Sequence, residues 1–236
     1  MTRSFYAAAA QLGPINKAET RSSVIERMLV LMEQAYECGC KLIVFPEMAL
    51  TTFFPRWHIT DATELGNYFE NQMPGPDTQV LFDTAREYQL GFYLGYCERT
   101  SYQSETSHFG FNTSILVDQS GTIIGKYRKV HLAGNAIPDS SLLLQHLEPW
   151  YFVDGDLGFP VFNAMLGKLG MLLCNDRRWP ESWRMLGLQG AELVCLGYNS
   201  PSQLPDSDAI CRIHRGLVLG RYNSFGRFDH YPYKFE

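Results

Sequence analysis

Three residues of reactive types follow three separate apolar stretches of the chain. Glu47 comes after Leu-Ile-Val-Phe-Pro, Lys129 follows the second strand of a predicted hairpin, and Cys174 ends the run Gly170-Met-Leu-Leu-Cys. In an open α/β sheet, side chains just beyond the carboxyl ends of different strands converge on one pocket. A carboxylate, an ammonium and a thiol brought together in this way form a candidate site for acyl transfer.

The thiol needs activation to act as a nucleophile. A free thiol with a pKa of about 8.5 is only a few per cent ionised at neutral pH. We expect neighbouring cations, and the start of the helix near Pro180, to lower the pKa of Cys174; a lowering of about two units corresponds to roughly 2.7 kcal/mol. Glu47 is then the candidate acceptor of the thiol proton, and the Lys129 ammonium the candidate stabiliser of a tetrahedral oxyanion.

Plainer interpretations of these residues remain open. A cysteine is often only apolar filler in a core. The segment after Cys174, residues 175–179, is too polar for a core, and its Arg177 and Arg178 are placed to bind a substrate carboxylate in a bidentate manner. The same arginines fit equally well in a surface ion-pair network with Asp176 and Glu181.

Strands and helices alternate along the chain. Apolar runs bounded by turn residues predict strands over Ala7–Gln11, Leu42–Phe45, Phe92–Cys97, Asn112–Val117, Thr122–Tyr127, Lys168–Cys174 and Glu192–Leu196. Helical periodicity predicts helices from an N-cap at Asn16 to a stop at Gly39, over Asp77–Gln89 with closure by Gly91, and over Pro180–Leu188. Residues 129–160 lack a period and are expected to be loop-rich. This pattern predicts an α/β fold with a mixed sheet.

Composition and charge narrow the class of protein. The chain has 236 residues, 45% of them hydrophobic and 19% charged, which is typical of a globular fold. Its 20 basic and 25 acidic residues give a net charge of -5, so we expect no nucleic-acid partner. No apolar run reaches the roughly 18 residues of a membrane span, and no export signal is visible. We therefore expect a soluble cytoplasmic protein with its six cysteines reduced and no membrane partner.

No metal or cofactor is expected. Cys38-x-Cys40 has no second pair at zinc spacing, and the histidines show no His-Glu-x-x-His pattern. Asn112-Thr-Ser is a formal glycosylation acceptor that carries little weight without an export signal. Beyond residue 200 no period persists, so we divide the chain into a domain over residues 1–201 and a divergent tail over residues 202–236. Binding of RNA by this tail is a further hypothesis, which a steep loss of affinity with salt would test.

The segments around the three reactive residues resemble the nitrilase, or carbon-nitrogen hydrolase, superfamily. Its hallmark is a Glu-Lys-Cys triad, matched here by Ile43-Val-Phe-Pro-Glu47, by Gly125-Lys-Tyr-Arg-Lys129 and by Gly170-Met-Leu-Leu-Cys174-Asn-Asp. Within the superfamily, Leu50-Thr-Thr-Phe-Phe-Pro-Arg-Trp-His and Asn175-Asp-Arg-Arg-Trp-Pro-Glu resemble the N-carbamoyl-D-amino-acid amidohydrolases. The resemblance runs from about residue 2 to residue 201.

The resemblance implies a role for each matching residue. Cys174 is the implied nucleophile, Glu47 the general base and Lys129 the oxyanion stabiliser. Glu148 matches a second family glutamate that helps to position the lysine, although its own context favours a solvated loop carboxylate. The residues implied to support the pocket are His131 and His146, and those implied to bind the substrate are Asn175, Arg177, Arg178 and Asn199.

The implied fold is an α-β-β-α sandwich that assembles into a homodimer or homotetramer. The implied activity is hydrolysis of an N-carbamoyl amino acid, or of a related amide, without a cofactor. Residues 202–236 do not resemble the family's C-terminal portion, so we expect the sandwich to be incomplete there. The alternative hypothesis is a truncated or diverged chain that is catalytically inactive and serves only as an assembly subunit.

Overall fold

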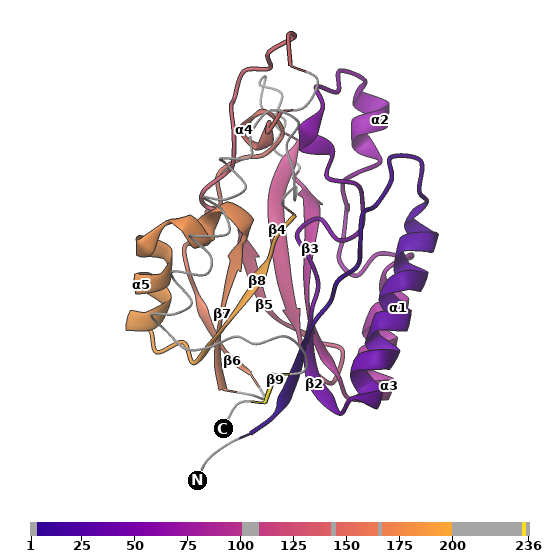
Figure 1. The fold of residues 1–236 in the computed structure, drawn as a ribbon, viewed down its shortest axis with the longest axis vertical. Helices are drawn as coiled ribbons and strands as arrows, with labels where there is room; N and C mark the ends of the chain where they lie inside the picture. Colours follow the sequence, from indigo (N-terminus) through magenta and orange to yellow (C-terminus); the bar gives the residue numbers. More distant parts are fainter. Residues whose placement is uncertain (1–3, 101–108, 143–144, 165–166, 200–232, 235–236) are drawn as a thin grey trace.

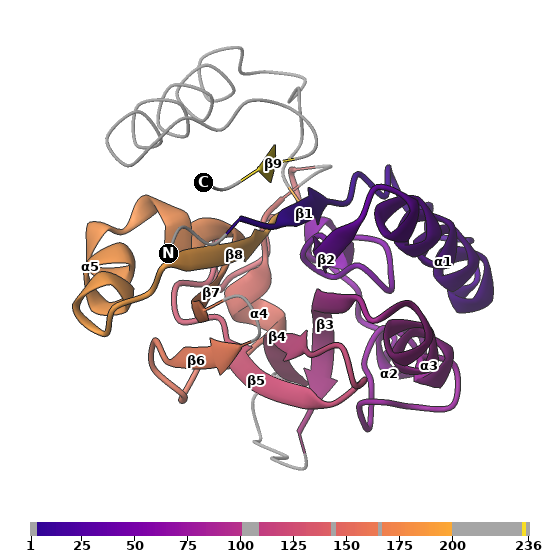
Figure 2. The same ribbon diagram turned by 90° about the horizontal axis from the view of Figure 1, so that it is seen from below.

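Two β-sheets lie face to face, with helices on the outer face of each (Figures 1 and 2). The computed structural model describes residues 4–100, 109–142, 145–164, 167–199 and 233–234. The first sheet has the order β5-β4-β3-β2-β1-β9, and its strands are β1 Tyr6–Ala9, β2 Cys40–Val44, β3 Gly91–Arg99, β4 Gly110–Val117, β5 Ile123–Arg128 and β9 Tyr233–Lys234. The second sheet has the order β6-β7-β8, with β6 Val161–Ala164, β7 Gly167–Leu173 and β8 Leu193–Gly197. The predicted α-β-β-α sandwich is confirmed.

Both sheets are mixed. Strands β1, β2 and β3 pair in parallel, whereas β4 and β5 continue the sheet as an antiparallel hairpin after β3. In the second sheet β7 pairs with β8 in parallel and with β6 in the antiparallel sense. Because β5 is two antiparallel steps from β3, strands β2, β3 and β5 run in the same direction, and their carboxyl ends meet at one edge of the sheet.

The helices differ in length and position. The three longer helices are α1 Arg21–Glu37 and α3 Gln79–Tyr88, on the outer face of the first sheet, and α5 Pro180–Leu188, on the outer face of the second. The short ones are α2 Ala62–Gly66, α4 Glu148–Tyr151 and the 3-10 turns η1 Phe54–Arg56 and η2 Cys174–Arg178. In the described part of the chain, no helix is both long and apolar enough to cross a bilayer.

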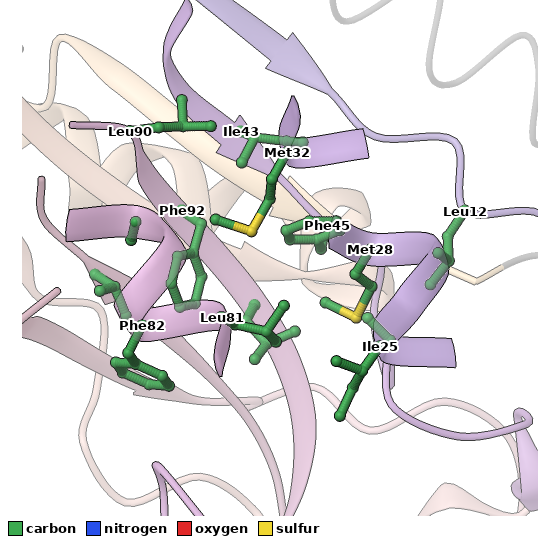
Figure 3. Close-up of a cluster of buried hydrophobic side chains, with 14 of the residues drawn as sticks. Leu12, Ile25, Met28, Met32, Ile43, Phe45, Leu81, Phe82, Leu90 and Phe92 are labelled. Carbon is green, nitrogen blue, oxygen red and sulfur yellow. The ribbon is translucent and has the colours of Figure 1, made fainter. Parts of the chain in front are cut away.

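Two layers of apolar side chains hold the sandwich together. Met28 and Met32 of α1 and Leu81 of α3 point toward Phe92 and its neighbours on the first sheet (Figure 3). Between the sheets, residues of β2, β3, β4 and β7 form a second cluster whose members include Leu42, Tyr93, Leu116, Leu169 and Met171. All of these side chains are fully buried, so their removal from water is the main force that fixes the strand ends.

Element boundaries depart from the sequence predictions where two signals compete. The helix predicted from Asn16 begins at Arg21, with Thr20 as N-cap accepting from the Ser23 N–H. Glu19 does accept the Asn16 N–H, but only an isolated turn forms, because the apolar stripe that anchors the helix starts at Val24. Similarly, Gln89 closes α3 in a left-handed conformation, and Gly91, predicted to close it, is the first residue of β3.

Candidate active site

The three reactive residues lie just beyond strand ends, as the sequence predicts. Glu47 follows β2, Lys129 follows β5 directly and Cys174 follows β7 directly. The Tyr93 hydroxyl donates to the Leu172 carbonyl oxygen at 2.9 Å, which ties β3 of the first sheet to β7 of the second. The two sheets therefore present these side chains at one end of the sandwich.

Two glycines allow the backbone to turn at Glu47. A Cβ at Gly95 would lie 2.9 Å from the Glu47 Cα, and one at Gly197 would lie 2.9 Å from the Glu47 backbone nitrogen. Side chains at these positions would force the loop away from β3 and β8. The close approach places the Glu47 carboxylate, which is fully buried, between the two sheets.

Lys129 and two glutamates form a buried ionic cluster. The Lys129 Nζ lies 2.6 Å from Glu47 Oε1 and 2.6 Å from Glu148 Oε2, and all three side chains are fully buried. Burial alone lowers the pKa of Lys129, but the Glu148 and Glu47 carboxylates outweigh it and hold this pKa well above its ordinary value. Lys129 is therefore an ammonium. Glu148 is not the solvated carboxylate that its local sequence favours.

Two amides complete the surroundings of Glu47. The Asn112 Nδ2 donates to Glu47 Oε1 at 2.8 Å, and the Asn199 backbone N–H donates to Glu47 Oε2 at 3.2 Å. Each carboxylate oxygen thus accepts a hydrogen bond from a different asparagine, one within β4 and one after β8, which fixes the orientation of the carboxylate. The sequence alone marks Asn112 only as a formal glycosylation acceptor. The signal that indicates its role is the polar run Asn-Thr-Ser inside an otherwise apolar strand.

Cys174 occupies a strained turn beside this cluster. Its φ angle is +43°, a left-handed conformation that costs a residue with a side chain roughly 1–2 kcal/mol. The Arg177 Nη1 donates to the Cys174 carbonyl oxygen at 2.7 Å and lies 3.6 Å from Sγ. Such strain persists only where the surrounding structure enforces it, and it turns the thiol out of the β7 ladder.

The expectation of a lowered thiol pKa is wrong. Burial, followed by the Glu47 carboxylate, raises the pKa of Cys174 to about 11, although Lys129 and Arg177 oppose the shift. The thiol also begins the 3-10 turn η2 rather than lying at the start of α5, so the α5 dipole is not aimed at it. At neutral pH Cys174 is consequently a thiol, and it would need a base in order to act as a nucleophile.

The protonation of Glu148 changes near neutral pH. Burial, only partly offset by Lys129 and reinforced by Glu47, raises its pKa from 4.5 to about 7. One ammonium next to two carboxylates carries a net charge of -1, and a proton on Glu148 removes it.

We expect Glu148→Gln to flatten the dependence of stability on pH. The folded protein keeps the Glu148 proton up to about pH 7, whereas the unfolded chain releases it near pH 4.5. This contribution to stability is full below pH 4.5 and is lost as pH rises through about 7, with a slope of up to about 1.4 kcal/mol per unit. Urea unfolding of both proteins between pH 5 and 8 measures it. Equal slopes would contradict the shift.

Asp176 joins the cysteine turn to the lysine segment. Its Oδ2 accepts from the Leu173 N–H at 3.1 Å and the Tyr127 hydroxyl at 2.8 Å, and its Oδ1 accepts from the His131 N–H at 2.9 Å. The His131 Nδ1 lies at the same distance from Oδ1, and Trp179 stacks on the ring with centroids 4.6 Å apart. Asp176 is fully buried, so it does not belong to a surface ion-pair network.

We expect Asp176→Asn to lower kcat by about 10- to 100-fold with KM within a few-fold. An amide nitrogen in place of one oxygen faces a backbone N–H, which leaves a buried donor unpaired and displaces the thiol. Tyr127→Phe removes one donor only and serves as the milder control. Steady-state ammonia release, together with thermal unfolding, separates the effects. An unchanged kcat with a lowered Tm would show that Asp176 is merely structural.

The residues predicted to bind substrate surround the cluster. Arg177 is buried and has the Tyr198 ring 4.9 Å from its guanidinium carbon, while Arg178 is half-buried and burial lowers its pKa. The Asn199 backbone contacts Glu47, as described above. The Asn175 Nδ2 donates to the carbonyl oxygens of His131 and Leu132, so this amide braces the lysine segment.

The described residues contain no cluster of three metal-ligating side chains. Five cysteines fall in this part of the chain and all are free thiols. Cys211, the tail over residues 202–236 and the RNA hypothesis attached to it lie outside it, apart from the short strand β9.

The chain belongs to the carbon-nitrogen hydrolase family, whose match spans residues 6–222. It is 29% identical to the N-carbamoylputrescine amidase of Solanum lycopersicum over 212 residues, covering 90% of this chain and 64% of that protein. It is 32% identical to the beta-ureidopropionase of Arabidopsis thaliana over 126 residues, which are 53% of this chain and 28% of the relative. The chain thus spans less than two thirds of the length of these relatives.

Solved structures show the same fold. The crystal structure of a carbon-nitrogen hydrolase from Helicobacter pylori G27 superposes with a TM-score of 0.72 at 24% identity, over 91% of this chain and 67% of that one.

Proposed function

We propose that this chain hydrolyses a non-peptide carbon-nitrogen bond of an N-carbamoyl amino acid, giving the amino acid, carbon dioxide and ammonia. The observation that carries the proposal is the buried contact of Lys129 with Glu47 and Glu148 beside the Cys174 thiol. The names of two relatives, an N-carbamoylputrescine amidase and a beta-ureidopropionase, denote carbamoylated substrates and support this chemistry.

The proposed reaction passes through a thiol-linked intermediate. Glu47 accepts the Cys174 proton as Sγ attacks the carbamoyl carbon, and the Lys129 ammonium stabilises the resulting oxyanion. Glu47 then returns the proton to the departing nitrogen, which leaves as ammonia or as the amino acid. In the second half, Glu47 takes a proton from water, the hydroxyl attacks the carbonyl carbon, and the thiol leaves with that proton. The carbamic acid that is released then decomposes to carbon dioxide and the remaining amine, which is ammonia if the amino acid left first.

The remaining predicted residues support the site in this proposal. Glu148 holds Lys129 in place, and the Asp176–His131 pair holds the thiol turn against the lysine segment. Arg177 and Arg178 bind the amino-acid end of the substrate. Assembly into a homodimer or homotetramer and a cytoplasmic location belong to the same proposal, and size-exclusion chromatography with light scattering tests the first.

An ammonia-release assay on D- and L-N-carbamoyl amino acids, a simple amide and a nitrile tests the proposed activity. We expect turnover of at least one N-carbamoyl amino acid, unaffected by a metal chelator. Release of ammonia only from the amide or nitrile would overturn the substrate class. A folded protein without turnover on any of the compounds would favour the inactive assembly subunit.

A further inference from the structure

Arg56 is a half-buried cation that has no acidic partner among the described residues. It is the last residue of η1, its side chain is half-buried, and its guanidinium carbon lies 5.6 Å from the centroid of the Phe53 ring. Its Nε is buried and has no hydrogen-bond acceptor within the described ranges, where Arg56 also forms no salt bridge. Burial lowers its pKa, as expected for a guanidinium that has lost water without gaining a carboxylate.

The backbone fixes Arg56 beside the reactive cluster. The Pro55 and Arg56 carbonyl oxygens accept the N–H groups of Leu147 at 2.9 Å and Gln145 at 3.0 Å, so η1 runs alongside the segment that leads into Glu148. Between these two contacts lies His146, whose ring centroid is 5.8 Å from that of Phe53. Arg56 and His146 thus share one aromatic surface next to the buried carboxylates.

The pKa of His146 depends on the charged groups around it. Burial, followed by Arg56, lowers its pKa, and Lys129 and Arg178 act in the same direction while Glu47 opposes them. The His146 Nδ1 is itself buried and has no partner in the described part of the chain. A ring nitrogen and a guanidinium nitrogen, both buried and both without a hydrogen-bond partner among the described residues, therefore lie near the same Phe53 ring.

Lys129, another cation near His146, differs from Arg56 because two carboxylates neutralise it. Dehydrating a guanidinium without a carboxylate costs free energy, and an arginine kept in this state is suited to an anionic ligand that supplies the missing acceptor. Arg56 can present a fork of two N–H groups to a carboxylate.

We propose that Arg56 contributes a further contact to the substrate carboxylate, alongside Arg177 and Arg178, and that with it the site selects carbamoylated acids over carbamoylated amines. This inference rests on the proposed function, and it identifies a specificity residue that the family motifs do not assign. The distinction matters because the relatives' names include both classes, a carbamoylated amine in N-carbamoylputrescine and a ureido acid in beta-ureidopropionase.

The test compares Arg56→Gln and Arg56→Lys on three carbamoyl compounds that differ in charge. N-carbamoylalanine is the anion, ethylurea its uncharged counterpart and a monocarbamoylated diamine the cation. For Arg56→Gln we expect KM for the anion to rise about 10- to 100-fold with kcat within threefold, the loss typical of one charged hydrogen bond. KM for ethylurea should not change in Arg56→Gln. KM for N-carbamoylalanine in Arg56→Lys should lie between the values for wild type and Arg56→Gln. Arg86→Gln, an exposed arginine on α3, is the matched control and should behave as wild type.

Binding of N-carbamoylalanine to the Cys174→Ala protein, with and without Arg56→Gln, separates this inference from the proposed function. One outcome is that Arg56→Gln weakens the calorimetric binding of N-carbamoylalanine while the wild type shows no turnover. This outcome overturns the proposed activity but supports the carboxylate site at Arg56. Turnover with a KM indifferent to Arg56→Gln overturns the inference alone. Equal weakening for ethylurea and N-carbamoylalanine also overturns it, because a carboxylate contact cannot act on a compound without a carboxylate.

Discussion

We expect Cys174→Ala to lower turnover of N-carbamoyl substrates by at least about 10⁴-fold while the protein stays folded. Loss of the nucleophile leaves only binding and oxyanion stabilisation, which provide a small part of the rate enhancement of a hydrolase. The substitution keeps the β-carbon, so the left-handed backbone at this position experiences the same strain. Ammonia release measured against circular dichroism and thermal unfolding gives the result.

Cys195→Ala is the matched control for the nucleophile. Cys195 is also buried, and burial alone raises its pKa to about 12, because it lies in β8 among apolar side chains. We expect this variant to keep turnover near the wild-type rate and to lose some stability from the small cavity. Turnover that survives Cys174→Ala and is lost in Cys195→Ala would identify Cys195 as the nucleophile and contradict the assignment of Cys174.

Lys129→Met should have the second-largest effect, on both rate and stability. Losing one oxyanion donor costs about 2.7–4 kcal/mol in the transition state, or roughly 10²- to 10³-fold in kcat. Removing the ammonium also leaves Glu47 and Glu148 buried without a cation, which typically destabilises a protein by about 3–5 kcal/mol. We therefore expect a protein whose kcat is reduced about 10²- to 10³-fold and which is markedly less stable at pH 8.

The pH dependence of this loss distinguishes charge from packing. Without Lys129 both carboxyl groups bind protons more tightly in the folded state, so the stability lost at pH 8 should partly return as pH falls toward 5. Lys126→Met on β5 removes a partly exposed lysine paired with Glu98 and should change stability by no more than about 1 kcal/mol. A Lys129→Met defect that is equally large at pH 5 and pH 8 would indicate lost packing instead.

The sequence predicts the positions of the reactive residues because their local signals agree. Each of Glu47, Lys129 and Cys174 follows an apolar run long enough to be a strand, and parallel strands align their carboxyl ends. The apolar stripe of α1 and the turn residues before β5 are equally plain. The fold class follows from this alternation of strands and helices.

Other features depend on contacts between distant segments that no local pattern encodes. The raised pKa of the Cys174 thiol results from burial between two sheets, which the neighbouring arginines in the sequence do not reveal. Asn112 reaches Glu47 across 65 positions of the chain, and Asp176 reaches His131 across 45. The position of Arg56 near the reactive cluster cannot be predicted from the sequence, because it depends on backbone hydrogen bonds between η1 and the segment that precedes Glu148.

Trapping with hydroxylamine during turnover tests most directly whether a thiol-linked intermediate forms. If Cys174 carries the carbamoyl group, hydroxylamine competes with water for it and yields a carbamoylated hydroxylamine in proportion to its concentration, at the expense of carbon dioxide. The identity of that product also shows whether ammonia or the amino acid leaves first. Undiminished carbon dioxide and no trapped product at any hydroxylamine concentration would mean that water attacks the substrate directly, contrary to the proposed mechanism.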